Sequence, residues 1–321
     1  MIKNIAIAGA GISGMSTAFV LKEKGYRVTI YARAFSPNIT SNKAAAFWFP
    51  YHIRNDKRGI GWCNTSYRYY LDFANDPTTG IGLQKLIKVL RTGVPEEEPI
   101  WREFMPGGSY SVIPGSSLAP GIEKAYDIQV PLIETQIFLP WLQQQLEQRG
   151  VVFIEQELQE FDALCGEYDL VINCTGLGSK ILCKDESMLP IKGQVALLEP
   201  GTDLPIYLDN EKPLYIVPRK DAIIIGGTFE EGLDTEATEP ETIERLLRNA
   251  YEVFPELKGK QVIGSWAGVR PYRSDVRVEQ EPGRNLIHNY GHGGSGFTLA
   301  FGCAESVGAI VASAPSPEGG T

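Results

Sequence analysis

The stretch MIKNIAIAGAGISG, residues 1–14, decides the fold of this chain. Lys3–Ala8 is a short apolar run of the kind that forms a buried strand, and Ser13–Lys24 has the pattern of a helix. Arg27–Tyr31 has the β-branched composition of a second strand. This order predicts a β-α-β unit with a right-handed crossover, which places both strands in a parallel sheet.

Three glycines in the connecting GAGISG serve different purposes. Gly9 permits a tight turn, Gly11 lets backbone N–H groups approach a pyrophosphate, and Gly14 allows the helix to pack closely on the strand. Ile12 and Ser13 begin the helix, whose N-terminus contributes positive potential toward a phosphate. This context predicts dinucleotide binding rather than a merely structural turn, but it does not separate NAD from FAD.

Arg33 ends the second strand, where a dinucleotide-binding fold usually has an acid that accepts hydrogen bonds from a ribose. An arginine only donates, so Arg33 could stack on an adenine or meet a phosphate, which would favour NADP. Solvation of Arg33 at the surface is an equally open alternative.

Composition bounds the function classes. The 321 residues are 43% hydrophobic, and the formal net charge of −9 argues against a nucleic-acid partner. Five cysteines without CxxC spacing and three histidines without ligand spacing indicate neither a metal site nor a disulfide framework. Since no apolar run is long enough for a membrane span, we expect a soluble, cytoplasmic protein with no membrane partner.

Apolar runs later in the chain predict an α/β fold with two domains. GVVFIEQ and YDLVINCTG are typical of a buried parallel sheet, whereas KGQVALLE, LYIVPR and AIIIGGTF predict a second, mixed sheet. We assign a discontinuous Rossmann-like dinucleotide-binding domain to residues 1–50, 134–180 and 265–321. A substrate-binding domain, inserted in two pieces, takes residues 51–133 and 181–264; the last residues, from Ser313, are expected to form a disordered tail.

The segment ITSNKAAAFWFPY follows the second strand. Thr40 and Ser41 could donate to a phosphate, and the small side chains of Ala44–Ala46 before Phe47 and Trp48 would let the backbone approach a flat ring. Ordinary packing of an aromatic cluster is the alternative.

HNYGHGGSGFTLAFGCA, residues 288–304, places four glycines around His292 and then becomes apolar at helical spacing. One or two glycines are enough for a turn with positive φ, and glycine costs backbone entropy. Four glycines indicate that a ligand approaches the backbone before a helix that begins near Phe297 or Thr298.

Seven segments, in this order along nearly the whole chain, resemble the signature segments of the D-amino-acid oxidase family of FAD enzymes: GAGISG, AAAFWFPY, VINCTG, YIVPR, IGGTF, GVRPYRSDVRVE and HNYGHGGSGFTLAFGCA. The resemblance implies non-covalent FAD, with the first domain as the FAD-binding one. It implies cofactor contacts at Gly9, Gly11, Ile12, Ser13, Gly14, Arg33, Thr40, Ser41, Ala45, Ala46, Phe47, Trp48, Cys174, Thr175, Gly176, Gly293, Gly294, Ser295, Gly296, Phe297 and Thr298.

The resemblance also implies an active site. Arg270 corresponds to the arginine that pairs with the substrate carboxylate, Tyr215 to a substrate-contacting tyrosine, and the carbonyl of Gly294 to the acceptor for the substrate amino group. The implied reaction transfers the α-hydrogen of a D-amino acid as hydride to the flavin. The imino acid then hydrolyses to a 2-oxo acid and ammonia, and molecular oxygen yields hydrogen peroxide.

Two departures from the family pattern bear on the substrate. Vertebrate members carry a lid tyrosine where this chain has Glu211, so the lid is differently built or absent, and Tyr207 is not a secure replacement. D-Aspartate-specific members place an arginine where Phe229 follows Gly-Gly-Thr, which favours neutral side chains here. His52 and Arg219 are the residues that would spoil this expectation.

Several alternatives stay open. Within the family these are a D-aspartate oxidase and a glycine- or sarcosine-type flavin amine oxidase. Outside it, Arg33 suggests an NADP-dependent dehydrogenase, and a non-catalytic dinucleotide sensor would have no need of Arg270. A homodimer is an open alternative to a monomer.

Overall fold

The computed structural model describes residues 3–54, 56–94, 101–105, 110–118 and 120–314. The expected tail therefore lies outside the described residues from 315 onward, while Ser313 ends a helix.

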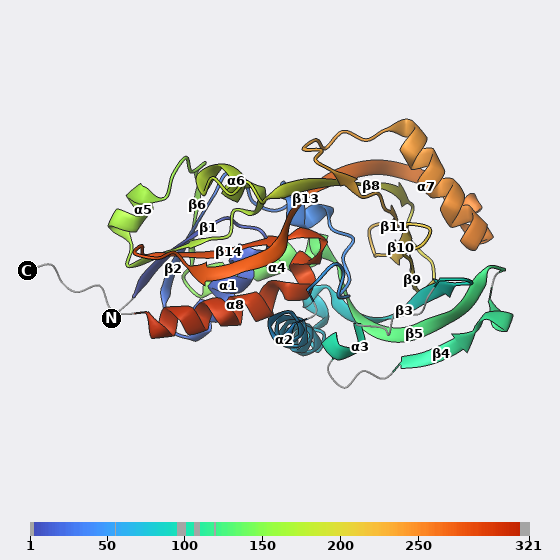
Figure 1. Ribbon diagram of the computed structural model, residues 1–321, viewed down its shortest axis with the longest axis horizontal. Helices are drawn as coiled ribbons and strands as arrows, with labels where there is room; N and C mark the ends of the chain where they lie inside the picture. Colours follow the sequence, from blue (N-terminus) through green and yellow to red (C-terminus); the bar gives the residue numbers. More distant parts are fainter. Residues whose placement is uncertain (1–2, 55, 95–100, 106–109, 119, 315–321) are drawn as a thin grey trace, which may run out of the picture.

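A parallel sheet forms one half of the molecule (Figure 1). Its strand order is β14-β7-β1-β2-β6, with bounds Leu286–His292, Leu170–Asn173, Asn4–Ala8, Arg27–Ala32 and Val152–Glu155. Ile5–Ala8 of β1 is fully buried, because helices cover both faces of the sheet and an apolar side chain suits either face. The strands and the first helix expected from the sequence are confirmed in their places.

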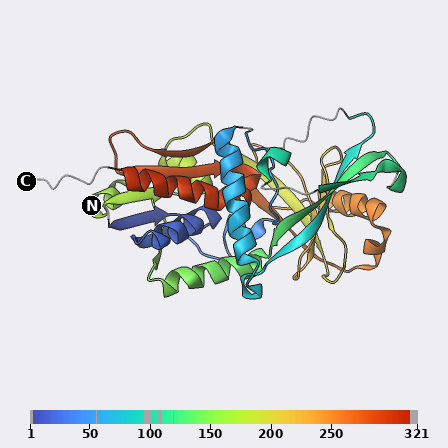
Figure 2. The same ribbon diagram turned by 90° about the horizontal axis from the view of Figure 1, so that it is seen from below.

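Helices cover the two faces unequally (Figure 1, Figure 2). One face carries the longer helices α1 (Ile12–Glu23), α4 (Thr135–Gln148) and α8 (Gly296–Ser313), and α2 (Lys57–Phe73) crosses α8. The other face carries the short helices α5 (Asp162–Glu167) and α6 (Ser179–Leu182). By length and hydropathy the stretch Gly293–Ser313 could cross a membrane, but 67% of its most apolar window is buried inside the molecule.

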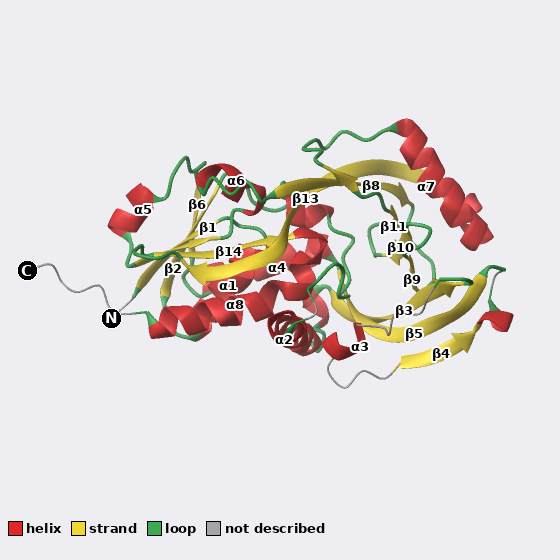
Figure 3. Ribbon diagram, in the orientation of Figure 1, coloured by secondary structure: helices red, strands yellow, loops and turns green. Residues whose placement is uncertain are grey.

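A mixed sheet forms the other half (Figure 3). The path β4-β5-β3-β9-β10-β11-β8-β13 runs through Tyr110–Pro114, Ile122–Ile133, Ile81–Arg91, Ile206–Asp209, Leu214–Pro218, Ile223–Gly226, Leu189–Leu198 and Val262–Gln280. Only β3 and β9 pair in parallel along this path; the other neighbours are antiparallel. The remaining elements are α3 (Trp101–Phe104), α7 (Pro240–Val253), β12 (Glu230–Glu231) and the 3₁₀ turns Thr40–Lys43, Pro77–Thr79, Gly115–Ser117, Gly176–Gly178, Pro255–Gly259 and Gly293–Ser295.

Strand β13 joins the two halves. Its 19 residues pair with β8 along Val262–Tyr272 and with β14 along Tyr272–Gln280, so both halves belong to one hydrogen-bonded sheet. The predicted domain boundaries after residues 180 and 264 fall within α6 and β13. They stay a prediction.

Candidate active site

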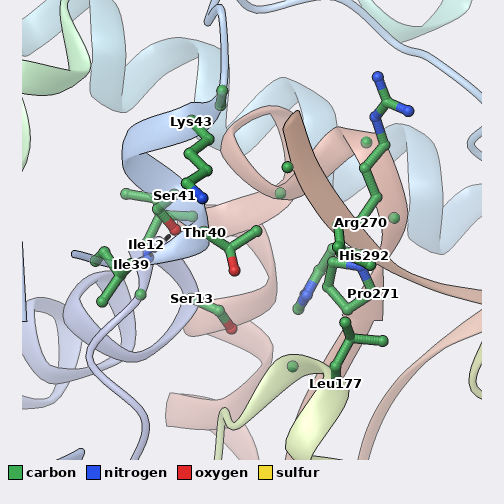
Figure 4. A pocket seen from close by; sticks show the side chains of 18 of the residues that line it. Ile12, Ser13, Ile39, Thr40, Ser41, Lys43, Leu177, Arg270, Pro271 and His292 are labelled. Carbon is green, nitrogen blue, oxygen red and sulfur yellow. Dashed lines mark hydrogen bonds between the residues drawn. The ribbon is translucent and has the colours of Figure 1, made fainter. Parts of the chain in front are cut away.

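A pocket of about 1140 Å³ joins the carboxyl ends of β1, β2 and β7 to the mixed sheet. In Figure 4, Ile12, Ser13, Thr40 and Ser41 stand on one side of it, and Arg270, Pro271 and His292 on the other. Segments far apart in the sequence thus meet at the edge where ligands of α/β sheets bind. All residues expected to touch the cofactor line this pocket except Gly14, Trp48 and Ser295.

These three residues lie behind the pocket wall. A Cβ on Gly14 would stand 1.9 Å from the carbonyl oxygen of Gly9, so this glycine permits helix-to-strand packing as expected. Trp48 is fully buried, and its Nε1 donates to the carbonyl of Cys63 at 3.2 Å. The hydroxyl of Ser295 donates to the backbone carbonyl of Tyr51.

The loop before α1 has the geometry of a dinucleotide cradle. Gly9 has φ +107°, and a Cβ there would lie 2.3 Å from the carbonyl oxygen of Cys174, which only glycine tolerates. The hydroxyl of Ser41 accepts from the backbone N–H of Ile12 at 3.0 Å, which leaves its own proton for a phosphate. Gly11 also lines the pocket, and because it has no side chain, a ligand in the pocket can approach the backbone of this loop. Burial raises the pKa of the Cys174 thiol to about 12, so Cys174 contributes shape and not a thiolate.

Arg33 lies at the end of the pocket beyond this loop. Its side chain is 81% exposed and stands 3.9 Å from the carboxylate of Glu157, which also lines the pocket. A carboxylate beside Arg33 would repel a 2′-phosphate, so this position gives NADP little support.

Arg219, weighed above as a second anchor for acidic substrates, lies outside the pocket lining. It is 4% exposed and donates from Nη1 to the carbonyls of Ala44 and Ala45 at 3.1 and 3.2 Å. Its other nitrogens bond the carboxylate of Asp221, and Thr135 Oγ1 accepts at 2.9 Å. Every nitrogen of the guanidinium therefore has a partner, and Nη1 holds the Ala44–Ala45 wall of the pocket.

Arg270 lies in the middle of β13 and places a positive charge in the pocket. The part of the pocket lined by Arg270, Tyr215 and Gly294, the residues expected to contact the substrate, is called the substrate end. The guanidinium of Arg270 lies flat over Gly193 of β8, where a Cβ would come within 2.3 Å of Nη2. Nη1 donates to the carbonyl of Thr228 at 3.0 Å, and within the described part of the chain no carboxylate forms an ion pair with it. A half-buried cation with a free face toward a pocket fits an anionic ligand.

Tyr215 and Tyr51 complete this end of the pocket. The Tyr215 ring lies over Gly226 and Gly227, where added Cβ atoms would stand 2.1 and 2.7 Å from it. Burial raises the pKa of both tyrosines, and this effect outweighs the positive charge of Arg270, which lowers the pKa. Both hydroxyls are therefore neutral and can donate hydrogen bonds.

The glycine loop before α8 approaches the same place. Gly291 and Gly293 have φ +90° and +55°, and a Cβ on Gly294 would be 3.2 Å from the Tyr51 ring and 3.4 Å from Arg270 Cδ. Helix α8 begins at Gly296, one residue before the earliest expected start. The N-terminus of this helix therefore lies at the pocket wall, which Gly296 and Phe297 line.

Sequence reasoning missed an aromatic wall at the substrate end. His52 stacks at an angle on Phe229 (5.4 Å between ring centroids) and edge-on against Tyr51 (4.2 Å). Tyr51 is the last residue of the AAAFWFPY segment quoted above, but no role was assigned to it there. His52 has φ +49°, a conformation that only the structure reveals. Burial and the charge of Arg270 lower the pKa of His52, so the ring is neutral.

Glu211 stands at the position where vertebrate members of the family have the lid tyrosine, and it does not line the pocket. Glu211 is exposed in the turn between β9 and β10, and Tyr207 is buried against Phe254, outside the pocket lining. The neighbouring Asn210 and Pro213 line the pocket instead.

Three further acidic side chains line the pocket. Asp234 and Glu236 line the pocket from the loop between β12 and α7, and Glu236 pairs with Lys43 on the opposite wall. Asp209, also in the lining, is paired with Arg91. Among the described residues, no group of three or more His, Cys, Asp or Glu side chains could hold a metal ion.

Comparisons with known proteins agree with this geometry. The family model described as FAD dependent oxidoreductase matches residues 4–310. The chain is 35% identical to a D-amino-acid oxidase of Rubrobacter xylanophilus over 98% of each chain, and 33% identical to a D-amino-acid oxidase of Dictyostelium discoideum over 94% of this chain and 89% of that one. Among solved structures, a glycine oxidase from Geobacillus kaustophilus has the same fold, with TM-score 0.80, 18% identity and coverage of 98% and 96%.

Proposed function

This chain belongs to the D-amino-acid oxidase family of FAD-dependent oxidoreductases, and from that premise we propose that it acts on D-amino acids with neutral side chains. The enzyme catalyses FAD-dependent oxidative deamination of D-amino acids. We further propose that molecular oxygen is the second substrate and leaves as hydrogen peroxide.

The pocket fits FAD on its own geometry. Glycines 9 and 14 leave no room for a Cβ, Gly11 and Ser41 present donors for phosphate, and the small side chains of Ala45 and Ala46 leave space for a flat ring. When bound, FAD supplies the acceptor for the hydride of the substrate α-carbon.

The free face of Arg270 is the observation that carries the proposal. Its planar fork can bind the α-carboxylate through two hydrogen bonds, and this fixes the orientation of the α-carbon. The neutral hydroxyls of Tyr215 and Tyr51 can donate to the same carboxylate, and the carbonyl of Gly294 can accept from the amino group. Position does most of the catalytic work, since none of these groups is a strong base.

The walls favour a neutral substrate side chain. His52 and Phe229 give flat, uncharged surfaces, and the nearby cation Lys43 is already paired with Glu236. Asp234 also lines the pocket, and its negative charge would disfavour a second carboxylate on the substrate.

Anaerobic mixing of the yellow holoenzyme with D-alanine, D-methionine, D-proline, D-aspartate and L-alanine tests the proposal. We expect the neutral D-amino acids to bleach the flavin absorbance, and aerobic turnover to give a 2-oxo acid, ammonia and hydrogen peroxide. No bleaching by any D-amino acid would overturn the substrate class. A higher kcat/KM for D-aspartate than for all the neutral substrates would overturn the preference alone.

Glycine is the control for the related alternative. Faster flavin reduction by glycine or sarcosine than by every D-amino acid would assign the chain to the glycine-oxidase type instead.

A further inference from the structure

A chain of hydrogen bonds leads from helix α1 to the ring of His292. Thr17 Oγ1 donates to the carbonyl of Ser13 at 2.7 Å, so its lone pairs accept from Asn289 Nδ2 at 3.0 Å. The amide orientation of Asn289 is thereby fixed, with Oδ1 turned toward His292 Nε2 at 3.1 Å.

The direction of this chain sets the tautomer of His292. Asn289 Oδ1 can only accept, so the proton of the ring lies on Nε2. Burial lowers the pKa of His292 to about 4, which keeps the ring neutral near pH 7. Nδ1 then carries a lone pair and no proton.

This Nδ1 retains access to the pocket. His292 is 8% exposed and lines the pocket, and none of the described residues bonds its Nδ1. The described side-chain atoms that are both fully buried and unpartnered are Asn42 Oδ1 and Gln136 Oε1. The Nδ1 atom of His292 is therefore an oriented acceptor that faces the pocket.

The place of His292 selects the group that it can bind. Figure 4 shows the ring on the same side as Arg270 and Pro271, across from Ser13 and Thr40. A lone pair repels phosphate oxygens, so the group must be a hydroxyl or an N–H. FAD carries three hydroxyls on the ribityl chain between its phosphates and its ring. We infer that His292 accepts a hydrogen bond from a ribityl hydroxyl, and that Thr17 and Asn289 act through it as positioning residues; this rests on the cofactor given above.

Nitrogen-15 NMR tests the tautomer directly, because the chain has only three histidines. With ¹⁵N-histidine-labelled protein, the signals missing from His292→Phe identify this ring. We expect the neutral Nε2–H tautomer at pH 7 in the apoprotein and a shift of the Nδ1 resonance when FAD is added. An Nδ1–H tautomer, a charged ring, or an Nδ1 signal unmoved by FAD would overturn the inference.

Cofactor analogues locate the hydroxyl. We expect wild type to bind one of 2′-, 3′- and 4′-deoxyribityl FAD about three- to tenfold more weakly than FAD, as for one lost hydrogen bond. His292→Phe should bind that analogue and FAD equally. Thr17→Val, which frees Asn289 to turn, should reduce the discrimination. Ser16→Ala is the matched control, because Ser16 also donates to Ser13 but has no bond to Asn289.

Equal binding of all four cofactors by wild type would overturn the inference, as would discrimination that survives in His292→Phe. If His292→Phe fails to fold, Thr17→Val and wild type decide between the same outcomes. No amino acid is added, so failure here is distinct from failure of the proposed substrate class.

Discussion

In the proposed function, the side chain that binds the substrate carboxylate is Arg270. Replacing it with alanine removes a charge-assisted pair of hydrogen bonds, so we expect kcat/KM to fall by roughly 30- to 5000-fold, about 2–5 kcal/mol. Arg270→Lys should recover only part of this, because a point charge lacks the planar fork. Flavin content should stay normal in both variants.

Steady-state kinetics on the best D-amino acid, beside flavin content, measure the effect. Arg273→Ala is the matched control, because Arg273 lies on the same strand but pairs with Asp185 outside the pocket. Near-normal kcat/KM in flavin-loaded Arg270→Ala would show that the carboxylate is bound elsewhere.

Gly193 makes a second prediction at this scale. The methyl group of Gly193→Ala would meet the guanidinium of Arg270, the far end of a flexible side chain, so the fold should tolerate it while Arg270 moves. We expect a nearly unchanged melting temperature and a fall in kcat/KM of about tenfold or more, mainly through KM.

Gly82→Ala provides the comparison, since a Cβ on Gly82 meets nothing within 4 Å. Equal kinetics for the two alanine variants would contradict the role given to Gly193.

Individual residues were predictable where a motif carried them. Arg270, Tyr215 and the glycine loop before α8 stand in segments that resemble those of the D-amino-acid oxidase family, and the structure brings them to one pocket. His52 and Phe229 were named only as modifiers of specificity, because their stacking depends on loops that are 177 residues apart. Trp48 was expected to contact the cofactor. The neighbouring residues Phe47 and Phe49 line the pocket, whereas the ring of Trp48 is fully buried in the core.

At the scale of elements, the turn between β10 and β11 supports the cofactor wall through Arg219. Arg219→Ala removes this buried cation from beside the buried carboxylate of Glu134 and the partly exposed carboxylate of Asp221, and losing one partner of a buried charge pair costs up to about 3–5 kcal/mol. We expect a lower melting temperature and weaker FAD binding, with partial rescue by Arg219→Lys.

Thermal unfolding of the apoprotein and FAD titration separate the two effects. Lys220→Ala is the control, since the Lys220 side chain is exposed and only its backbone N–H bonds Glu134. Unaltered FAD affinity in Arg219→Ala would contradict a role in holding Ala44 and Ala45.

Asp185 ties the turn before β8 to β13 and β14. Burial alone would raise its pKa, but hydrogen bonds from Ser187 and Tyr290 and the charge of Arg273 outweigh burial and bring the pKa to about 2. Because the pKa of Asp185 is lower in the folded state than in the unfolded state, its ionised carboxylate stabilises the fold. This stabilisation is complete well above the unfolded pKa of 3.8 and is lost as the pH falls through about 2. The shift corresponds to about 2 kcal/mol at pH 7.

Asp185→Asn should therefore lower the free energy of unfolding at pH 7, and the difference from wild type should shrink between about pH 4 and pH 2. Denaturant titrations across this range measure it, with exposed Asp203→Asn as the control. A difference that is constant with pH would assign the effect to packing instead.

Elements were predictable where apolar runs and turn residues coincide, as in β1, α1 and β7. The length of β13 was not predictable from the sequence, because its exposed and buried residues do not alternate regularly. The strand changes its pairing partner at Tyr272. The role of Arg219 was also hidden, since its bonds to Ala44 and Ala45 span about 175 residues of sequence.

At the scale of the whole molecule, the pocket expected to hold the cofactor is lined by both halves of the chain. The pocket takes lining from Gly9 to Thr298, so FAD should stabilise the fold as a unit. At free FAD about 100 times its Kd we expect about 2.7 kcal/mol of added stability and a melting temperature higher by several degrees. Acid or heat should release the FAD intact, because the link is non-covalent.

A thermal-shift titration with FAD, and with NADPH as the comparison, tests this expectation. A shift with NADPH and none with FAD would contradict the cofactor. The α/β class was predictable from the order of the strands. That the two sheets are continuous was not, because pairing between β8 and β13 depends on contacts about 70 residues apart.

The continuity of β13 limits how such an enzyme can be re-engineered. Arg270, which we propose binds the substrate carboxylate, lies on the strand that also belongs to the dinucleotide half. This strand pairs with β8 at Arg270 and with β14 from Tyr272 onward. Exchanging the substrate half with that of a relative would therefore cut a sheet rather than a linker. New substrate ranges should be sought by changing the wall at His52, Phe229 and Asp234, where side chains can vary while the shared strand stays intact.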